Sequence, residues 1–109
     1  MVNRLEKLVR DKIPQIIEKS GEIPLMRVLE EEEYLAALER KLDEEVGEFH
    51  ERKAVEELAD ILEVIYALAE AHGSTVKELE KIYAQKHDAR GGFSERILLI
   101  GKTENDEKT

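Results

Sequence analysis

The chain has 109 residues and no cysteine, 39% of its residues are charged, and its formal net charge is −9. This length suits a single domain, and the missing cysteine excludes disulfides, thiolate catalysis and zinc–thiolate sites. The negative charge argues against nucleic acid and membrane surfaces as partners, and no apolar run resembles a signal peptide or a membrane span. We therefore expect a cytoplasmic protein. Few aromatic residues (5%) and many strong helix formers favour an all-α fold.

The first predicted helix spans residues 11–20, where Asp11 is a suitable N-cap and Ser20 begins the stop signal. Residues 22–29 are expected to be extended, because Pro24 disfavours helical geometry in the residue before it. The chain is therefore expected to reach its first long helix after a short helix and an extended connection.

Two long helices are predicted next, one over about residues 30–50 and the other over about residues 54–71. In the first, apolar residues recur at spacings of three and four, and the acidic residues at its start suit the helix dipole. This apolar stripe consists of Leu35, Leu38, Leu42, Val46 and Phe49. The second helix is apolar around most of its circumference, apart from one narrow solvated strip. The strip consists of Glu56, Glu63 and Glu70.

A third helix is expected after a left-handed stop at Gly73, which suits that conformation because it has no side chain. Ser74 or Thr75 is the expected N-cap of this helix. The helix is expected to reach about His87, and the double glycine that begins at Gly91 ends the region.

The C-terminal part of the chain contains one short apolar run at residues 97–100, which predicts a strand or a tail packed on the helices. Residues 102–109 are expected to be disordered, so the sequence predicts one domain over residues 1–101. The aromatic residues are expected to lie in the core more often than to stack on a base. They are Tyr34, Phe49, Tyr66, Tyr83 and Phe93.

Two pairs of acidic residues, three apart in each pair, lie on the long helices. The pairs are Glu45 with Glu48 and Glu57 with Asp60. Residues three apart share one face of a helix, and a short polar turn over residues 51–53 makes the two helices antiparallel neighbours. With this turn centred between Arg52 and Lys53, the hairpin is expected to bring the four carboxylates level in two rungs.

Four converging carboxylates predict a site for a hard divalent cation, namely Mg²⁺, with Mn²⁺ as a substitute. Such a cation neutralises substrate phosphates, places a water molecule in line with a phosphorus and lowers the pKa of that water. A remaining carboxylate, Glu44 or Glu45, is expected to accept the proton as general base. No protein nucleophile is required, which suits a chain without cysteine.

A non-enzymatic interpretation competes with this one. The chain has 26 acidic residues, so acidic pairs three apart also arise as solvated helix faces. The protein would then be an acidic helical interaction module that oligomerises through its leucine-rich stripe. A diiron site in a helical bundle is disfavoured, because it normally requires Glu-x-x-His and neither acidic pair supplies a histidine.

Residues 41–49 (KLDEEVGEF) and 56–68 (EELADILEVIYAL) together resemble the Glu-Glu-x-x-Glu … Glu-x-x-Asp signature of MazG-like nucleoside triphosphate pyrophosphohydrolases. This all-α superfamily also includes phosphoribosyl-ATP pyrophosphohydrolase and the dimeric dUTPases. The resemblance implies a magnesium site in which Glu44 has a supporting role. Its implied ligands are Glu45, Glu48, Glu57 and Asp60. The spacer between Glu48 and Glu57 is eight residues, shorter than in typical MazG proteins, and this difference concerns the substrate-facing loop more than the metal site.

Residues 5–21 and 90–93 are similar to a small branch of this superfamily, whose members are described as house-cleaning phosphohydrolases of non-canonical nucleotides. Basic residues must then hold the phosphates. Lys41 lies one turn before Glu45, and it is expected either to bind phosphate or to pair with Glu45 or Glu44. The other phosphate-binding candidates are favoured because they lie in the two segments that resemble the branch. They are Arg10, Lys12, Lys86 and Arg90.

The sequence thus predicts an antiparallel helical hairpin in a MazG-like bundle that oligomerisation completes. The apolar circumference of residues 54–71 needs more cover than one chain of this size supplies, so a homodimer or higher homo-oligomer is expected. By the resemblance, water attacks the α-phosphorus of a nucleoside triphosphate and releases pyrophosphate. Phosphoribosyl-ATP is the alternative substrate within the same chemistry, and no sequence pattern specifies the base.

Overall fold

The computed structural model describes residues 6–104, and helices are the regular elements of this part of the chain. They are α1 (Ile13–Lys19), α2 (Glu31–Arg52), α3 (Val55–Ala71) and α4 (Val76–Arg90). No β-strand occurs within the described range, which confirms the predicted all-α class. None of the helices described there is long and apolar enough to cross a membrane.

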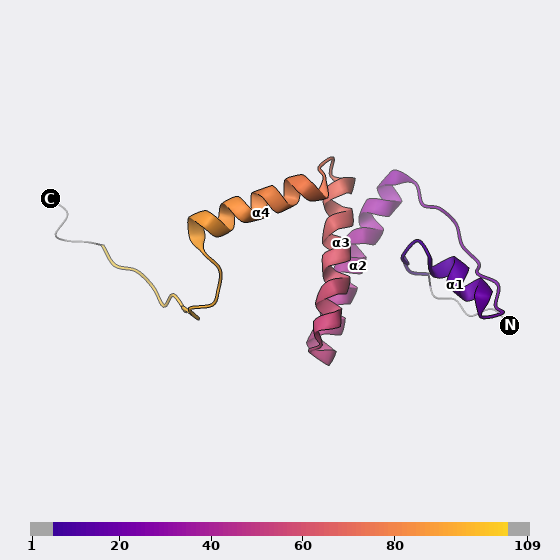
Figure 1. The fold of residues 1–109 in the computed structure, drawn as a ribbon, viewed down its shortest axis with the longest axis horizontal. Helices are drawn as coiled ribbons and strands as arrows, with labels where there is room; N and C mark the ends of the chain where they lie inside the picture. Colours follow the sequence, from indigo (N-terminus) through magenta and orange to yellow (C-terminus); the bar gives the residue numbers. More distant parts are fainter. Residues whose placement is uncertain (1–5, 105–109) are drawn as a thin grey trace.

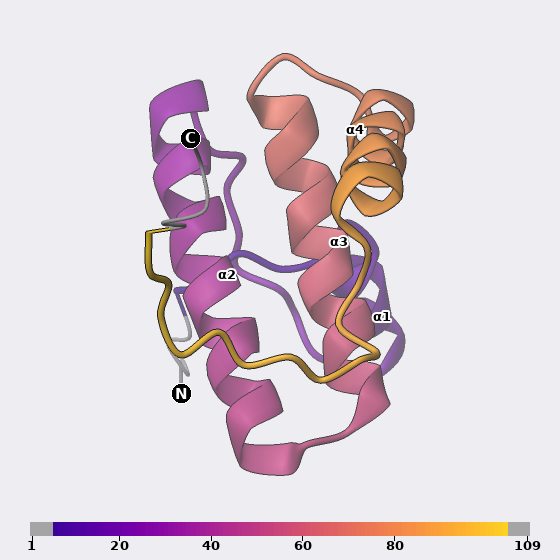
Figure 2. The same cartoon turned by 90° about the vertical axis from the view of Figure 1, so that its left-hand side faces the viewer.

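The α2 and α3 helices form an antiparallel hairpin, and they lie side by side along their lengths (Figures 1 and 2). Two residues, Lys53 and Ala54, join them. Lys53 has φ 55° and ψ 30°, and its backbone N–H donates to the carbonyl oxygen of Phe49 at 2.7 Å, which ends α2. The predicted turn is confirmed, but its centre lies one residue later than expected.

The interior of the hairpin is small. Three apolar residues are buried within the described chain, namely Ala37, Leu38 and Val64. Leu38 belongs to the predicted stripe of α2, whereas the other stripe residues are half-buried. The hairpin therefore buries little apolar surface, and α3 leaves Val55, Leu58 and Leu62 exposed.

The start of α2 is held by charged side chains. Glu30 is the N-cap, and its backbone N–H donates to the carboxylate of Glu33 at 3.4 Å. Arg27 donates two hydrogen bonds to the same carboxylate, at 3.1 Å and 2.7 Å. These contacts lower the pKa of Glu33 to about 2, with the Arg27 hydrogen bond as the largest cause. The same pairing raises the pKa of Arg27.

The α1 helix is shorter than predicted and begins at Ile13. Its N-cap is Lys12 and not Asp11, and no side chain caps it. The predicted Asp11 cap is wrong because residues 11 and 12 continue a turn into the helix, with Lys12 already in right-handed helical geometry. The predicted stop at Ser20 is confirmed. No contact joins α1 to another helix in the described structure.

The α4 helix leaves the hairpin at a wide angle (Figure 1). Gly73, with φ 84°, makes the bend, and Thr75 caps α4 by accepting from the backbone N–H of Glu78 at 3.0 Å. Near the bend, Tyr66 donates to Glu80 at 3.0 Å, which raises the pKa of the tyrosine. The helix ends at Arg90, one turn beyond the predicted end at His87, because Gly91 is the first residue with positive φ.

Residues 91–104 carry no helix or strand, and they extend away from the hairpin (Figure 1). The predicted strand or packed tail at residues 97–100 is wrong, because these four side chains are 79–94% exposed and no other described segment covers them. Tyr83 and Phe93, expected in the core, are also exposed. Residues 102–104 lack regular structure, and the rest of the predicted disordered tail, residues 105–109, lies outside the described part.

Candidate metal centre

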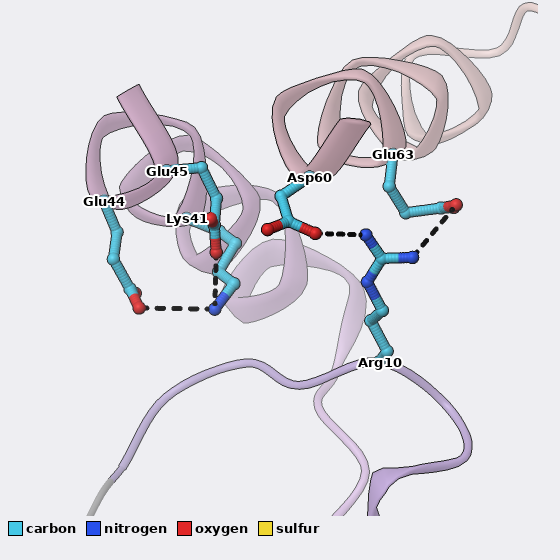
Figure 3. A network of polar contacts seen from close by, with 6 residues as sticks. All are labelled: Arg10, Lys41, Glu44, Glu45, Asp60 and Glu63. Carbon is cyan, nitrogen blue, oxygen red and sulfur yellow. Dashed lines mark hydrogen bonds and ion pairs between the residues drawn. The ribbon is translucent and has the colours of Figure 1, made fainter. Parts of the chain in front are cut away.

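Three carboxylates of the hairpin converge on one point. Glu45 comes from α2, and Glu57 and Asp60 come from the first turns of α3. One oxygen atom of each residue lies within 4.8 Å of an oxygen atom of both others. The group lies on the face of the hairpin that the N-terminal loop crosses, and Figure 3 shows Glu45 and Asp60 on facing helices. Three of the four carboxylates that were predicted to converge between the two helices therefore do so.

The local fold explains why Glu57 is the most enclosed of the three. It lies in the first turn of α3, where its backbone N–H donates to the carbonyl oxygen of Ala54 at 3.1 Å. This turn directs the side chain toward α2, and Glu57 is only 8% exposed. Val64, two turns further along α3, is buried on the same side. A carboxylate in such a position requires a positive partner to offset its desolvation.

Glu48, the fourth predicted ligand, is not part of the three-residue group. Its carboxylate lies 3.5 Å from the guanidinium of Arg52, one turn later on the same helix. Glu48 lies outside the group because the turn is centred one residue later than predicted, which changes the register of α3 against α2. The two predicted rungs therefore do not form as drawn from the sequence, and a role for Glu48 as a ligand stays a prediction.

Each member of the three-carboxylate group has one basic partner. Lys41 lies 3.3 Å from Glu45 and also 3.3 Å from Glu44. The guanidinium of Arg52 lies 3.5 Å from Glu57. These contacts match the predicted pairing of Lys41, and they add Arg52, which the sequence assigned only to the turn. The pairing of Arg52 could have been predicted from its position four residues after Glu48 on the same helix.

Arg10 supplies the third basic partner from outside the hairpin. Its guanidinium donates to Asp60 at 2.7 Å and lies 3.7 Å from Glu63 (Figure 3). Arg10 was a phosphate-binding candidate, and the structure places it at the edge of the carboxylate group. Glu63 was assigned to the solvated strip, and no sequence pattern indicated its pairing across fifty-three positions of the chain.

Among residues 6–104, the ion pairs around this group join six carboxylates to four basic groups, which leaves an excess of two negative charges among these ten groups at neutral pH. The carboxylates belong to Glu44, Glu45, Glu48, Glu57, Asp60 and Glu63, and the basic groups to Lys7, Arg10, Lys41 and Arg52. A single divalent cation would neutralise this excess.

A hollow of about 190 Å³ adjoins this network beside Lys41. Its lining includes three basic residues, Lys7, Arg40 and Lys41, and two acidic ones, Glu6 and Glu44. The hollow is smaller than the roughly 300 Å³ of an ordinary small-molecule pocket, so its size suits a phosphate group better than a whole nucleotide. Sequence reasoning missed Arg40, which lies in no motif.

The remaining phosphate-binding candidates lie elsewhere. Lys12 is at the exposed start of α1, and Lys86 and Arg90 lie near the far end of α4. Because α4 points away from the hairpin, the structure does not bring Lys86 and Arg90 to the carboxylate group of their own chain (Figure 1).

The donor set fits a hard divalent cation. Mg²⁺ binds oxygen ligands at 2.0–2.1 Å, so two oxygens on opposite sides of the ion are about 4.2 Å apart. Neighbouring ligands of one ion are about 3 Å apart, so at least two of the three separations between these oxygens, now within 4.8 Å of one another, must be about 3 Å when a cation binds. All three donors are carboxylate oxygens, which suit Mg²⁺ or Mn²⁺. Loading the site requires Lys41, Arg10 and Arg52 to share or release these oxygens.

Comparisons with known proteins give little further information. No protein-family model matches the chain, and no solved structure matches it. A protein of Mycolicibacterium smegmatis, described as an uncharacterized protein, is 54% identical over 44 residues, which are 40% of this chain. The chain spans less than half (45%) of the length of that relative.

Proposed function

We propose that the chain is a magnesium-dependent hydrolase that converts a nucleoside triphosphate, non-canonical by preference, to a monophosphate and pyrophosphate. The observation that carries the proposal is the convergence of Glu45, Glu57 and Asp60 beside a basic hollow. The resemblance of residues 41–49 and 56–68 to MazG-like enzymes supports it as well. A cytoplasmic location and phosphoribosyl-ATP as the alternative substrate belong to the same proposal.

In this proposal, Glu45, Glu57 and Asp60 hold the cation. When bound, the cation supplies positive charge that offsets the phosphate oxygens and makes a water molecule more acidic. The basic side chains Lys41 and Arg40 bind and orient the phosphate chain, because both line the hollow and Lys41 lies 3.3 Å from Glu45.

The chemical step is then an attack of the water oxygen on the α-phosphorus. A bond forms between that oxygen and phosphorus, the bond from phosphorus to the bridging oxygen breaks, and pyrophosphate leaves with the electron pair. Glu44 accepts the proton of the water, because it faces the hollow next to Lys41 and lies outside the three-carboxylate group. Glu45 is the alternative base if it does not serve as a ligand.

Pyrophosphate release from canonical and oxidised or deaminated nucleoside triphosphates tests the proposal. With Mg²⁺ present, Glu57→Gln is expected to lower kcat/KM on the order of 100-fold, because it removes a ligand while keeping the side-chain shape. Glu56→Gln is the matched control, since it removes the same charge one residue away on the solvated side of α3. Equal rates for the two variants, or no release of pyrophosphate from any triphosphate, would show the proposal to be wrong.

A specific observation favours the second candidate, the non-enzymatic interaction module. Each carboxylate of the group has a basic partner, so side chains of the protein itself can balance these charges. Thermal unfolding with and without millimolar Mg²⁺ separates the two. A ligand that binds only the folded state raises Tm by mass action, and Asp60→Asn should abolish this rise in an enzyme site. In an interaction module Mg²⁺ leaves Tm unchanged.

A further inference from the structure

The α3 helix carries a row of large apolar residues that the rest of the described chain covers only in part. The row consists of Val55, Leu58, Leu62 and Ile65, with exposed fractions of 78%, 46%, 44% and 36%. Their spacings of three, four and three are those of a helix surface that packs against another helix. We refer to these four residues as the α3 seam.

The α3 seam lies away from both α2 and the carboxylate group. Val64 is buried against α2, and Leu62 precedes it by two residues. At about 100° per residue, the two side chains point about 160° apart around the helix. Glu57 and Asp60 lie on the side of Val64, so cover on the α3 seam leaves the carboxylate group accessible.

The arm, which we define as α4 with residues 91–100, also has apolar side chains without cover. No residue of α4 is buried, and Ile82 and Tyr83 are 50% and 65% exposed. The end of the arm adds Phe93 and residues 97–100. The arm touches its own hairpin only where α4 leaves α3, and it projects from there into solvent (Figure 1).

The chain exposes more surface than a compact monomer of its mass. The chain exposes 10521 Å², whereas a compact monomer of 12.5 kDa exposes about 6,200 Å². Its radius of gyration is 20.2 Å, against about 13 Å for a compact chain of this length. The excess is about 4,300 Å² per chain, or about 8,600 Å² for a pair, which is more than the roughly 2,000–5,000 Å² in total that obligate dimers bury, so a second copy has ample surface to cover.

Charge indicates which surface covers the α3 seam. The α3 helix contains five acidic residues and neither Lys nor Arg, so two α3 helices packed together would repel each other. The α4 helix contains three acidic residues and four basic ones, a net charge of +1 against −5 for α3, so α3 attracts it where a second α3 would be repelled. The four basic residues recur along the helix. They are Lys77, Lys81, Lys86 and Arg90.

We propose that this chain pairs with a second copy by exchange of arms, so that the arm of each copy lies along the α3 seam of the other. Ile82 and Tyr83 then cover Leu58 and Leu62 of the second copy, and the basic residues of α4 face the acidic sides of α3. This assembly does not depend on the proposed hydrolase activity, because the α3 seam and the carboxylate group lie on different sides of α3.

Disulfide trapping tests this pairing directly, because the natural chain has no cysteine. One preparation of the full chain carries Leu62→Cys and another carries Ile82→Cys, and the two are mixed and mildly oxidised. We expect a crosslinked dimer that forms in the mixture at least about tenfold faster than in either preparation alone, as effective concentration requires. Glu39→Cys, on the exposed side of α2, replaces Leu62→Cys as the control and should not crosslink.

Three outcomes would overturn the proposal. The first is preferred crosslinking of Leu62→Cys with itself, which means that α3 packs on α3. The second is a crosslinked monomer from a chain with both substitutions, which means that the arm folds back on its own hairpin. The third is a monomer in sedimentation equilibrium at up to about 100 μM of the natural chain. If a dimer forms, Leu62→Glu should weaken it on the order of 100-fold, whereas Ala36→Glu, at an exposed position of α2, should not.

Discussion

The α2–α3 hairpin and the arm differ in where their apolar side chains lie, although both consist largely of helix. The hairpin buries Leu38 and Val64 between its helices, and it adds a network of ion pairs. The arm buries no residue of α4 and exposes Ile82 and Tyr83. The hairpin therefore packs its apolar side chains within one chain. The arm carries large apolar side chains as well, but the described part of the chain leaves them exposed. The following predictions test that difference.

The largest effect is expected from Leu38→Ala. Leu38 is 2% exposed, and its truncation leaves a cavity in the apolar contact between α2 and α3. We expect the free energy of unfolding to fall by about 3 kcal/mol, measured by urea unfolding followed by circular dichroism.

The corresponding change in the arm is Ile82→Ala. At low protein concentration it should change the free energy of unfolding by less than about 0.5 kcal/mol, because the side chain is half exposed. A larger loss that appears only at high concentration would locate Ile82 in the interface with a second copy. Equal losses for Ile82→Ala and Leu38→Ala at low concentration would contradict the contrast between the two regions.

The joints of the two regions offer the next test. In the turn between α2 and α3, Lys53 has left-handed backbone geometry with positive φ. In the turn between α3 and α4, Gly73 has positive φ. Lys53→Gly should raise the free energy of unfolding by about 1 kcal/mol, since glycine adopts positive φ without steric strain. Gly73→Ala should lower it by a similar amount. Thermal unfolding measures both, and Lys53→Ala, which keeps the strain, should show no gain.

A smaller effect is expected for Arg10→Gln. Arg10 pairs with Asp60 at 2.7 Å and therefore competes with a cation for that carboxylate. Its removal should tighten Mg²⁺ binding about two- to fivefold, the range expected for a largely exposed ion pair. The Mg²⁺ dependence of Tm measures this change. Arg27→Gln, which breaks an ion pair remote from the carboxylate group, should leave Mg²⁺ binding unchanged.

The smallest effect concerns pH and the start of α2. The pKa of Glu33 is about 2 in the folded chain, below its ordinary value of about 4.3 in an unfolded one. The charged carboxylate therefore stabilises the folded state above about pH 4.3, and this contribution is lost as the pH falls toward 2. Arg27→Gln should flatten the acid limb of a plot of Tm against pH. An unchanged acid limb would mean that this exposed pair contributes nothing to stability.

Much of the helical architecture follows from local signals. The bounds of α2, α3 and α4 are predicted to within a few residues. The signals are the positions of Pro and Gly, the apolar spacing of three and four residues, and the acidic first turn. The Lys41 ion pairs also follow from helix spacing. The Asp11 cap failed because the geometry of Lys12, which no composition rule specifies, decides where the first helix begins.

Tertiary contacts decided the membership of the candidate site. The turn is centred one residue later than spacing predicts, and Glu48 lies outside the three-carboxylate group, paired with Arg52. Spacing does not reveal such a shift, because several turn geometries connect the same two helices. Arg10 and Glu63 lie far apart in the sequence, and only the path of the N-terminal loop brings them together. The exposure of residues 97–100 also depends on tertiary structure. An apolar run suggests that these side chains pack somewhere, but it does not indicate which surface they pack on.

The amino-acid sequence alone determined that this protein is helical, that two long helices fold back on each other, and that carboxylates accumulate where they meet. Helical propensity, periodicity and short-range capping act over a few residues, so they can be derived without coordinates. Only the tertiary structure decided which carboxylates converge, which basic groups neutralise them and which apolar faces remain open. These features depend on the register and direction of whole helices, which small changes in a single turn alter.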